Sequence, residues 1–270
     1  MQISQIDLQK IVDLVRNTAK YAVISEEFVR AIVLSEIQKG KTVREVVKST
    51  RNKLHQVGYA YQQNKIPYES WQKELENLPQ DFRSDKNLQF ITNCLKYHSS
   101  TSERLPFLAS FFRQTLAPIG LVESILDLAC GFTPLCLPWM PVTENVRYTG
   151  IDIYEDLIRF LGQFFTHSQI EHKFSVGNIL EIIPRDKVQL ALLLKTIPCL
   201  EQVSKQAGRR ILESIKAENI LVSFPSRSLG GRLKGMAENY ENHFYELISG
   251  KHWHITKTEF PNEITFLIQK

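Results

Sequence analysis

The alternation of short apolar runs with amphipathic stretches after residue 120 limits the fold of this chain more than any other feature. The runs are rich in β-branched and aliphatic residues, which predicts strands separated by helices. We predict strands over 124–129, 146–153, 172–176, 189–194, 219–224, 254–260 and 264–269, and helices over 155–166 and 205–217. Such an alternation is typical of a parallel sheet with helices on both faces. The last two strands, joined by Pro261-Asn262-Glu263, predict an antiparallel hairpin at the end of an α/β fold.

The first hundred residues follow a different rhythm. Apolar residues recur at helical period in the stretches 6–15 and 28–37, and Ser25 before two glutamates is a plausible helix N-cap. No convincing strand precedes residue 120. We therefore predict a helical domain over residues 1–104 and an α/β domain over residues 105–270.

The net charge of +4 is unevenly distributed. Residues 1–104 hold 16 Lys and Arg against 12 Asp and Glu, whereas residues 105–270 hold 17 of each. Five cations accompany a single acid between residues 40 and 55, and they are Lys41, Arg44, Lys48, Arg51 and Lys53. The first four have helical spacing and would form one basic stripe on a helix. The stripe is either an RNA-binding face or an ordinary solvated helix face.

Several classes of protein are excluded by what the sequence lacks. It contains no run of eighteen apolar residues, and its first residues lack the basic start and apolar stretch of a signal peptide. Its four cysteines show no C-x-x-C pair and no zinc spacing. We expect a cytoplasmic protein with reduced thiols, no bound metal and no membrane contact.

The ends of the predicted strands suggest a nucleoside site. The first strand runs into the segment DLACGFTP (127–134), where Gly131 lets the backbone approach a ligand closely, and the next strand ends at Asp152. A carboxylate in that place can accept both hydroxyls of a ribose. The segment lacks the G-x-G-x-x-G of dinucleotide enzymes, which argues against a pyrophosphate ligand and favours S-adenosylmethionine. An ordinary strand-to-helix turn without a ligand would also explain the sequence of this segment. Asn178, after the third strand, is either an adenine contact or a turn residue.

Further segments have a distinctive sequence: KLHQVGYAY (53–61), HSSTSER (98–104), LLLKTIPCLEQ (192–202), VSFPSRSLGGRLKGMAENY (222–240) and NEITFLIQK (262–270). Together with DLACGFTP they resemble one family, the aminoglycoside-resistance 16S rRNA (guanine-N7) methyltransferases of the Arm and Rmt type. The resemblance covers nearly the whole chain. It implies a class I (Rossmann-like) methyltransferase sheet, preceded by a helical domain that docks on the small ribosomal subunit.

The resemblance also assigns roles to residues. It implies a cofactor site for S-adenosylmethionine made of Arg104, Ala129, Gly131, Asp152, Ile153, Asn178, Ile179 and Leu194. In it Arg104 matches the arginine that pairs with the cofactor's methionine carboxylate, and Asp152 matches the acid that binds the ribose. At the position of Asn178 relatives commonly have aspartate, so the adenine contact differs here. The alternative to this cofactor contact is that Arg104 forms a salt bridge on the surface.

The implied substrate is a decoding-site guanosine of 16S rRNA within the 30S subunit. We expect the five cations of residues 41–53 to bind RNA, together with Arg227, Arg232 and Lys234 of the glycine-rich loop, although these three could also be solvated loop charges. Guanine N7 carries a lone pair and no proton, so its methylation needs no general base, and we predict no catalytic acid or base. We expect a monomer whose activity confers aminoglycoside resistance.

Three other functions remain open at this point. The chain could methylate another rRNA position, such as adenine N1, or be a non-catalytic RNA-binding assembly factor that keeps only the fold. It could also methylate a small molecule. Such an enzyme would not need the basic N-terminal region, so deleting residues 1–100 would be expected to distinguish it from an rRNA methyltransferase.

Overall fold

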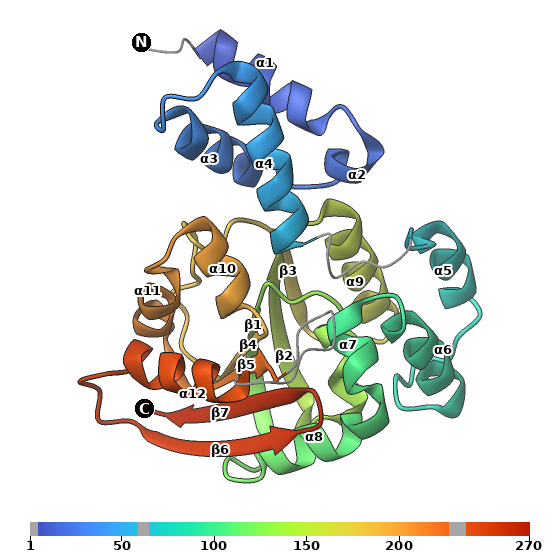
Figure 1. The fold of residues 1–270 in the computed structure, drawn as a ribbon. Helices are drawn as coiled ribbons and strands as arrows, with labels where there is room; N and C mark the ends of the chain where they lie inside the picture. The colour runs from blue at the N-terminus through green and yellow to red at the C-terminus, as the bar shows by residue number, and fades with distance from the viewer. Residues whose placement is uncertain (1–4, 59–64, 227–235) are drawn as a thin grey trace.

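The computed structural model describes residues 5–58, 65–226 and 236–270. Its centre is a seven-stranded sheet with the order β3-β2-β1-β4-β5-β7-β6 (Figure 1). The strands are β1 (Val122–Leu128), β2 (Val142–Asp152), β3 (His172–Val176), β4 (Val188–Leu194), β5 (Ala217–Pro225), β6 (His254–Phe260) and β7 (Glu263–Gln269). The first five are parallel to one another, and β7 runs antiparallel between β5 and β6. The predicted parallel sheet with a terminal antiparallel hairpin is confirmed.

The central strands are long apolar runs because both faces of the sheet are covered. On β1, Ile125 packs with one core while Leu126 and Leu128 pack with the other. The first core lies under α8 (Leu108–Leu116) and α9 (Glu155–His167), and the second under α10 (Ile197–Val203), α11 (Ala207–Ser214) and α12 (Met236–Leu247), as in Figure 1. Strand order reverses between β1 and β4, which places the switch point of the sheet there.

Four N-terminal helices form the upper lobe of the molecule in Figure 1. They are α1 (Gln5–Arg16), α2 (Ala19–Ala22), α3 (Glu26–Ile37) and α4 (Val43–Val57). Ser25 caps α3 as predicted, and α4 begins with a complete capping box between Thr42 and Glu45. The lobe is tied to the carboxyl end of β2, because the Ser25 amide donates to the Ile153 carbonyl at 2.7 Å.

The next helices pack beside the sheet. They are α5 (Tyr68–Leu75), α6 (Asp85–Leu95) and α7 (Ser99–Arg104). Trp71 of α5 and Phe90 of α6 contact the Phe160 ring of α9 at centroid distances of 5.3 and 6.5 Å. These helices therefore share the core of the α/β part, and a domain boundary at residue 104 stays a prediction.

Several elements of the α/β part escaped the sequence-based prediction. The 3₁₀ segment Thr133–Trp139 and helix α10 span only seven residues each, too few to display a helical period. Helix α12 begins within the segment 222–240, which was singled out only for its motif, and continues to Leu247. The predicted helix over 205–217 is shorter than expected, because the chain turns extended at Ile215 and Ala217 pairs with Val188 as the first residue of β5.

Candidate functional site

A pocket opens at the carboxyl ends of β1, β2 and β4, beside the switch point of the sheet. Seven of the eight residues predicted to bind the cofactor line it: Ala129, Gly131, Asp152, Ile153, Asn178, Ile179 and Leu194. They lie at or just after the carboxyl ends of the four strands β1 to β4, which the parallel sheet brings to one edge. Arg104 is not among the lining residues.

The backbone is strained where β1 and β4 end. Ala129 has φ of 56° and Lys195 has φ of 58°, in the left-handed region that residues with a Cβ rarely adopt. Gly131 has φ of 49°, and a Cβ added to it would lie 3.3 Å from the His98 ring. Strain of this kind concentrates at functional sites. Gly131 is therefore required both for its conformation and for the close approach of His98.

Asp152 ties the two strand ends together. Its Oδ2 accepts the Gly131 amide at 2.9 Å, and its Oδ1 accepts the amides of Ile153 and Tyr154 at 2.7 and 3.3 Å. Burial raises the pKa of the Asp152 carboxyl, and these three backbone hydrogen bonds act in the opposite direction. A carboxylate offers about four acceptor positions, so about one remains for a ligand.

Asn178 has both ends of its side chain engaged in the turn after β3. Its Oδ1 accepts the Leu180 amide at 3.1 Å, and its Nδ2 donates to Glu181 at 3.1 Å. The residue nevertheless lines the pocket. Its role as a turn residue is therefore visible in the structure, whereas its contact with an adenine stays a prediction.

Arg104 lies in a buried ion-pair network next to the pocket. Its Nε and Nη2 donate to Glu263 of β7 at 3.0 and 2.6 Å, and its side chain is fully buried. The two-pronged guanidinium face is thus used by Glu263. Nη1 is buried and has no hydrogen-bond partner among the described residues, which leaves its two N–H groups as unused donors.

The same network contains Lys195, which the sequence analysis did not single out. Its Nζ donates to Glu103 at 2.7 Å and lies 3.8 Å from Glu263, and the residue lines the pocket. A signal existed, because Lys195 directly follows an unbroken apolar run that ends β4. A lysine directly after such a run marks the end of the strand, and Lys195 is also buried.

His98 is a second buried titratable group at this end of the pocket. Burial, with help from the charges of Arg104 and Lys195, lowers the pKa of His98 to about 4 from an ordinary 6.5.

Between these pKa values of His98 the unfolded chain binds a proton that the folded chain does not, so acidification from pH 6.5 to 4 should reduce stability by about 3 kcal/mol. We expect His98→Gln to flatten this part of the pH profile of urea unfolding. Parallel profiles for both proteins would contradict the assignment.

Residues before the sheet build one wall of the pocket. Phe28, Val57, Gly58, Ile66 and Tyr68 all line it. A Cβ at Gly58 would collide with the Tyr154 ring, so the end of α4 sits directly on the loop after β2. The proposed test of deleting residues 1–100 therefore fails, because the deletion would remove part of the pocket as well as the basic lobe.

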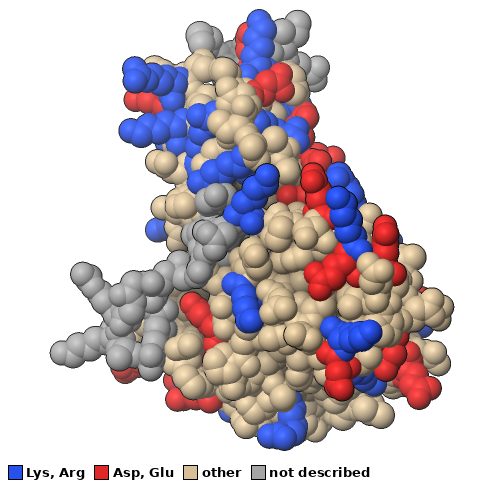
Figure 2. Space-filling view, turned by 90° about the vertical axis from the view of Figure 1, so that its right-hand side faces the viewer, with Lys and Arg blue, Asp and Glu red and all other residues tan. Residues whose placement is uncertain are grey.

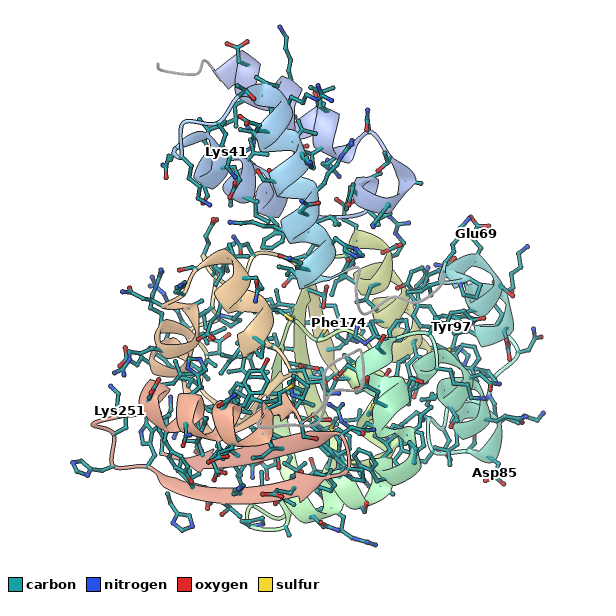
Figure 3. The ribbon with its side chains drawn as sticks, viewed as in Figure 1. Lys41, Glu69, Asp85, Tyr97, Phe174 and Lys251 are labelled. Atoms are coloured by element: carbon teal, nitrogen blue, oxygen red, sulfur yellow. The ribbon has the colours of Figure 1, made fainter. Side chains whose placement is uncertain are left out.

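The predicted basic stripe is only partly present. Lys41 precedes α4 instead of lying on it (Figure 3). It pairs with the buried Glu36, as Lys53 does at 2.9 Å. Arg51 donates to the Leu14 carbonyl at 2.6 Å. The physical reason is that a buried carboxylate and the free carbonyls at the end of α1 recruit the nearest cations.

Two predicted RNA-binding cations remain exposed on α4. Arg44 and Lys48 form no ion pair within the described part of the chain. Figure 2 shows Lys and Arg side chains gathered over the upper lobe, whereas the lower body on that face mixes both signs. Arg227, Arg232 and Lys234 lie outside the described residues. Among the helices that the structure describes, none is both long and apolar enough to cross a membrane.

Comparisons with known proteins agree with this architecture. The family described as "Ribosomal RNA methyltransferase (FmrO)" matches residues 17–268. The 16S rRNA (guanine(1405)-N(7))-methyltransferase of Micromonospora rosea is 29% identical over 258 residues, covering 95% of this chain and 94% of its own. The enzyme of the same name from Serratia marcescens is 28% identical over 251 residues, covering 93% and 94%.

Solved structures give the same answer for the fold. The crystal structure of the 16S rRNA methyltransferase RmtF in complex with S-adenosyl-L-homocysteine superposes with a TM-score of 0.82 at 25% identity, covering 100% of both chains. The 16S rRNA methylase RmtB has a TM-score of 0.80 at 22% identity, covering 99% of this chain and 100% of its own. Because the family match spans nearly the whole chain, this protein belongs to the FmrO family of ribosomal RNA methyltransferases.

Proposed function

We propose that this enzyme transfers a methyl group from S-adenosylmethionine to N7 of guanine 1405 in 16S rRNA, the reaction named for its relatives. The observation that carries the proposal is the similarity over almost the full length of those relatives, since both the helical lobe and the α/β part are matched. We further propose that it acts in the cytoplasm, as a monomer, on the assembled 30S subunit.

The residues of the pocket fit S-adenosylmethionine. Asp152 retains about one acceptor position for a ribose hydroxyl. The buried Nη1 of Arg104, in the ion-pair network that includes the pocket residue Lys195, offers unused donors. Leu194 and Ile179 supply apolar walls. When bound, the cofactor supplies an electrophilic methyl group.

The chain's own part in the reaction is to position the reactants. Guanine N7 carries an in-plane lone pair and no proton, so no side chain has to act as a general base. We infer that the buried ion pair between Arg104 and Glu263 and the turns at Ala129 and Lys195 fix the shape of this part of the pocket. Rigid placement of two reactants can supply most of the rate enhancement of such a reaction.

The target base requires an unusual presentation. N7 faces the major groove, which is deep and narrow in A-form RNA, so side chains cannot reach it in a regular helix. The guanosine must be extruded or offered by distorted RNA. This supports the assembled subunit as the substrate, and efficient methylation of a short free hairpin would speak against it.

The test is incubation of the purified protein with unmethylated 30S subunits and radiolabelled S-adenosylmethionine, followed by mapping of the labelled nucleotide. Label at N7 of guanine 1405 is the expected result, together with aminoglycoside resistance in a susceptible bacterium that expresses the protein. Label at an adenine or at another guanine would replace the proposed target. Bound cofactor without any label would favour an assembly factor.

The exposed cations of α4 should contribute to substrate binding through RNA phosphates. We expect the double variant Arg44→Gln/Lys48→Gln to bind 30S subunits about tenfold more weakly at moderate salt, and to reduce the slope of log K against log salt by roughly 1 to 2. The matched control is Lys86→Gln/Arg113→Gln, which removes two exposed cations from α6 and α8. Equal losses in both double variants would show that only total charge matters.

A further inference from the structure

Tyr68, the first residue of α5, is held rigidly at the wall of the pocket. Its ring contacts Trp71, Phe132 and Phe160 at centroid distances of 5.7, 6.4 and 5.6 Å. Phe132 belongs to the turn after β1, so the tyrosine is packed against the same loop that contains Gly131. The next residue, Glu69, is exposed on the outer side of α5 (Figure 3).

The hydroxyl of Tyr68 is buried and has no hydrogen-bond partner among the described residues. A buried hydroxyl without a partner is costly, because it has lost its water and gained nothing in exchange. Proteins normally satisfy such groups, and an unsatisfied one in a binding pocket points to a ligand that completes it.

The surroundings of Tyr68 identify the part of the pocket that it serves. Burial raises the pKa of the Tyr68 hydroxyl, and the nearby carboxylates of Asp156 and Asp152 raise it further. The group therefore keeps its proton and remains a donor as well as an acceptor. Asp152 is the residue that we assign to the ribose, and both residues line the same pocket.

We propose that Tyr68 is a further cofactor-binding residue, whose hydroxyl forms a hydrogen bond with a ribose hydroxyl of S-adenosylmethionine beside Asp152. This inference rests on the proposed function. A ribose diol has two donors and two acceptors, while Asp152 has only about one acceptor left after its three backbone contacts. Tyr68 supplies the second partner that the diol needs. The residues preceding the sheet then take part in cofactor recognition and not only in RNA docking.

The experiment compares wild type, Tyr68→Phe and the control Tyr97→Phe by calorimetric titration with S-adenosylhomocysteine. Tyr97 contacts the same Trp71 ring at 5.2 Å but does not line the pocket. We expect Tyr68→Phe to raise Kd about tenfold, the effect of one hydrogen bond in a buried site, while Tyr97→Phe leaves Kd unchanged. Thermal unfolding without ligand should show Tyr68→Phe equal to or more stable than wild type, because an unsatisfied hydroxyl is removed.

Titration with 2′-deoxy and 3′-deoxy analogues of S-adenosylhomocysteine tests the ribose contact directly. For one of the two analogues, wild type and Tyr68→Phe should bind equally, since the partner hydroxyl is missing from the ligand. A tenfold difference that persists with both analogues, or unchanged Kd in Tyr68→Phe, would overturn the proposal while leaving the cofactor assignment intact. Failure of the wild type to bind S-adenosylhomocysteine would overturn the cofactor assignment itself, and this proposal with it.

Discussion

Glu263→Gln should lower the free energy of unfolding by about 3–5 kcal/mol, the usual cost of leaving one partner of a buried ion pair without its counter-charge. Glutamine has nearly the same shape, so the loss comes from charge. Glu263 is 1% exposed, accepts two hydrogen bonds from Arg104 and lies 3.8 Å from Lys195. Urea unfolding of both proteins at the same pH measures the difference.

A double variant separates charge from packing in this network. Arg104→Met/Glu263→Gln removes both charges and should recover a large part of the stability lost in Glu263→Gln, because no buried guanidinium is left unpaired. The double variant should bind the cofactor more weakly than wild type, since the unpartnered Nη1 of Arg104 is lost as well. If Glu263→Gln lowered the free energy of unfolding by less than about 1 kcal/mol, water would have to reach Arg104 and the ion pair would contribute little.

The second large effect is expected for Asp152→Asn. Loss of the charged acceptor should weaken S-adenosylhomocysteine binding about tenfold, which corresponds to one charge-assisted hydrogen bond of roughly 1.5 kcal/mol. Stability should also fall, because an amide nitrogen would face either the Gly131 amide or those of Ile153 and Tyr154. Calorimetric titration and urea unfolding report the two losses separately.

Asp156→Asn is the matched control for this variant. Asp156 lies four residues further on, in the first turn of α9, and accepts the Leu157 amide at 2.8 Å without lining the pocket. We expect its cofactor affinity to remain within about twofold of wild type. Comparable losses of affinity in the two variants would show that negative charge near the pocket, and not the position of Asp152, determines binding.

The sheet was predictable because its signals are local. The strand over 172–176 and the hairpin strand over 254–260 match β3 and β6 residue for residue. The residues that line the pocket at the strand ends were predictable for the same reason, because parallel strands must bring their carboxyl ends to one edge. Gly131 and Asp152 could thus be identified from the strand boundaries alone.

The features that the sequence did not predict depend on contacts between segments that are distant in the chain. The pairing of Arg104 with Glu263 joins residues 159 positions apart, and no local sequence pattern around either residue predicts it. The same holds for Glu36, whose burial withdraws Lys41 and Lys53 from the predicted basic stripe. Tyr68 was overlooked because its aromatic neighbours come from the loop after β1 and from α9.

The long separation between Arg104 and Glu263 also has a consequence for the order of events during protein synthesis. At translation rates of about 5–20 residues per second, the arginine is made roughly 8 to 30 seconds before its carboxylate partner. During that interval the guanidinium must stay hydrated, since burying it alone would be prohibitive. We therefore expect the region around Arg104 to close only after β7 has been made and has paired with β5.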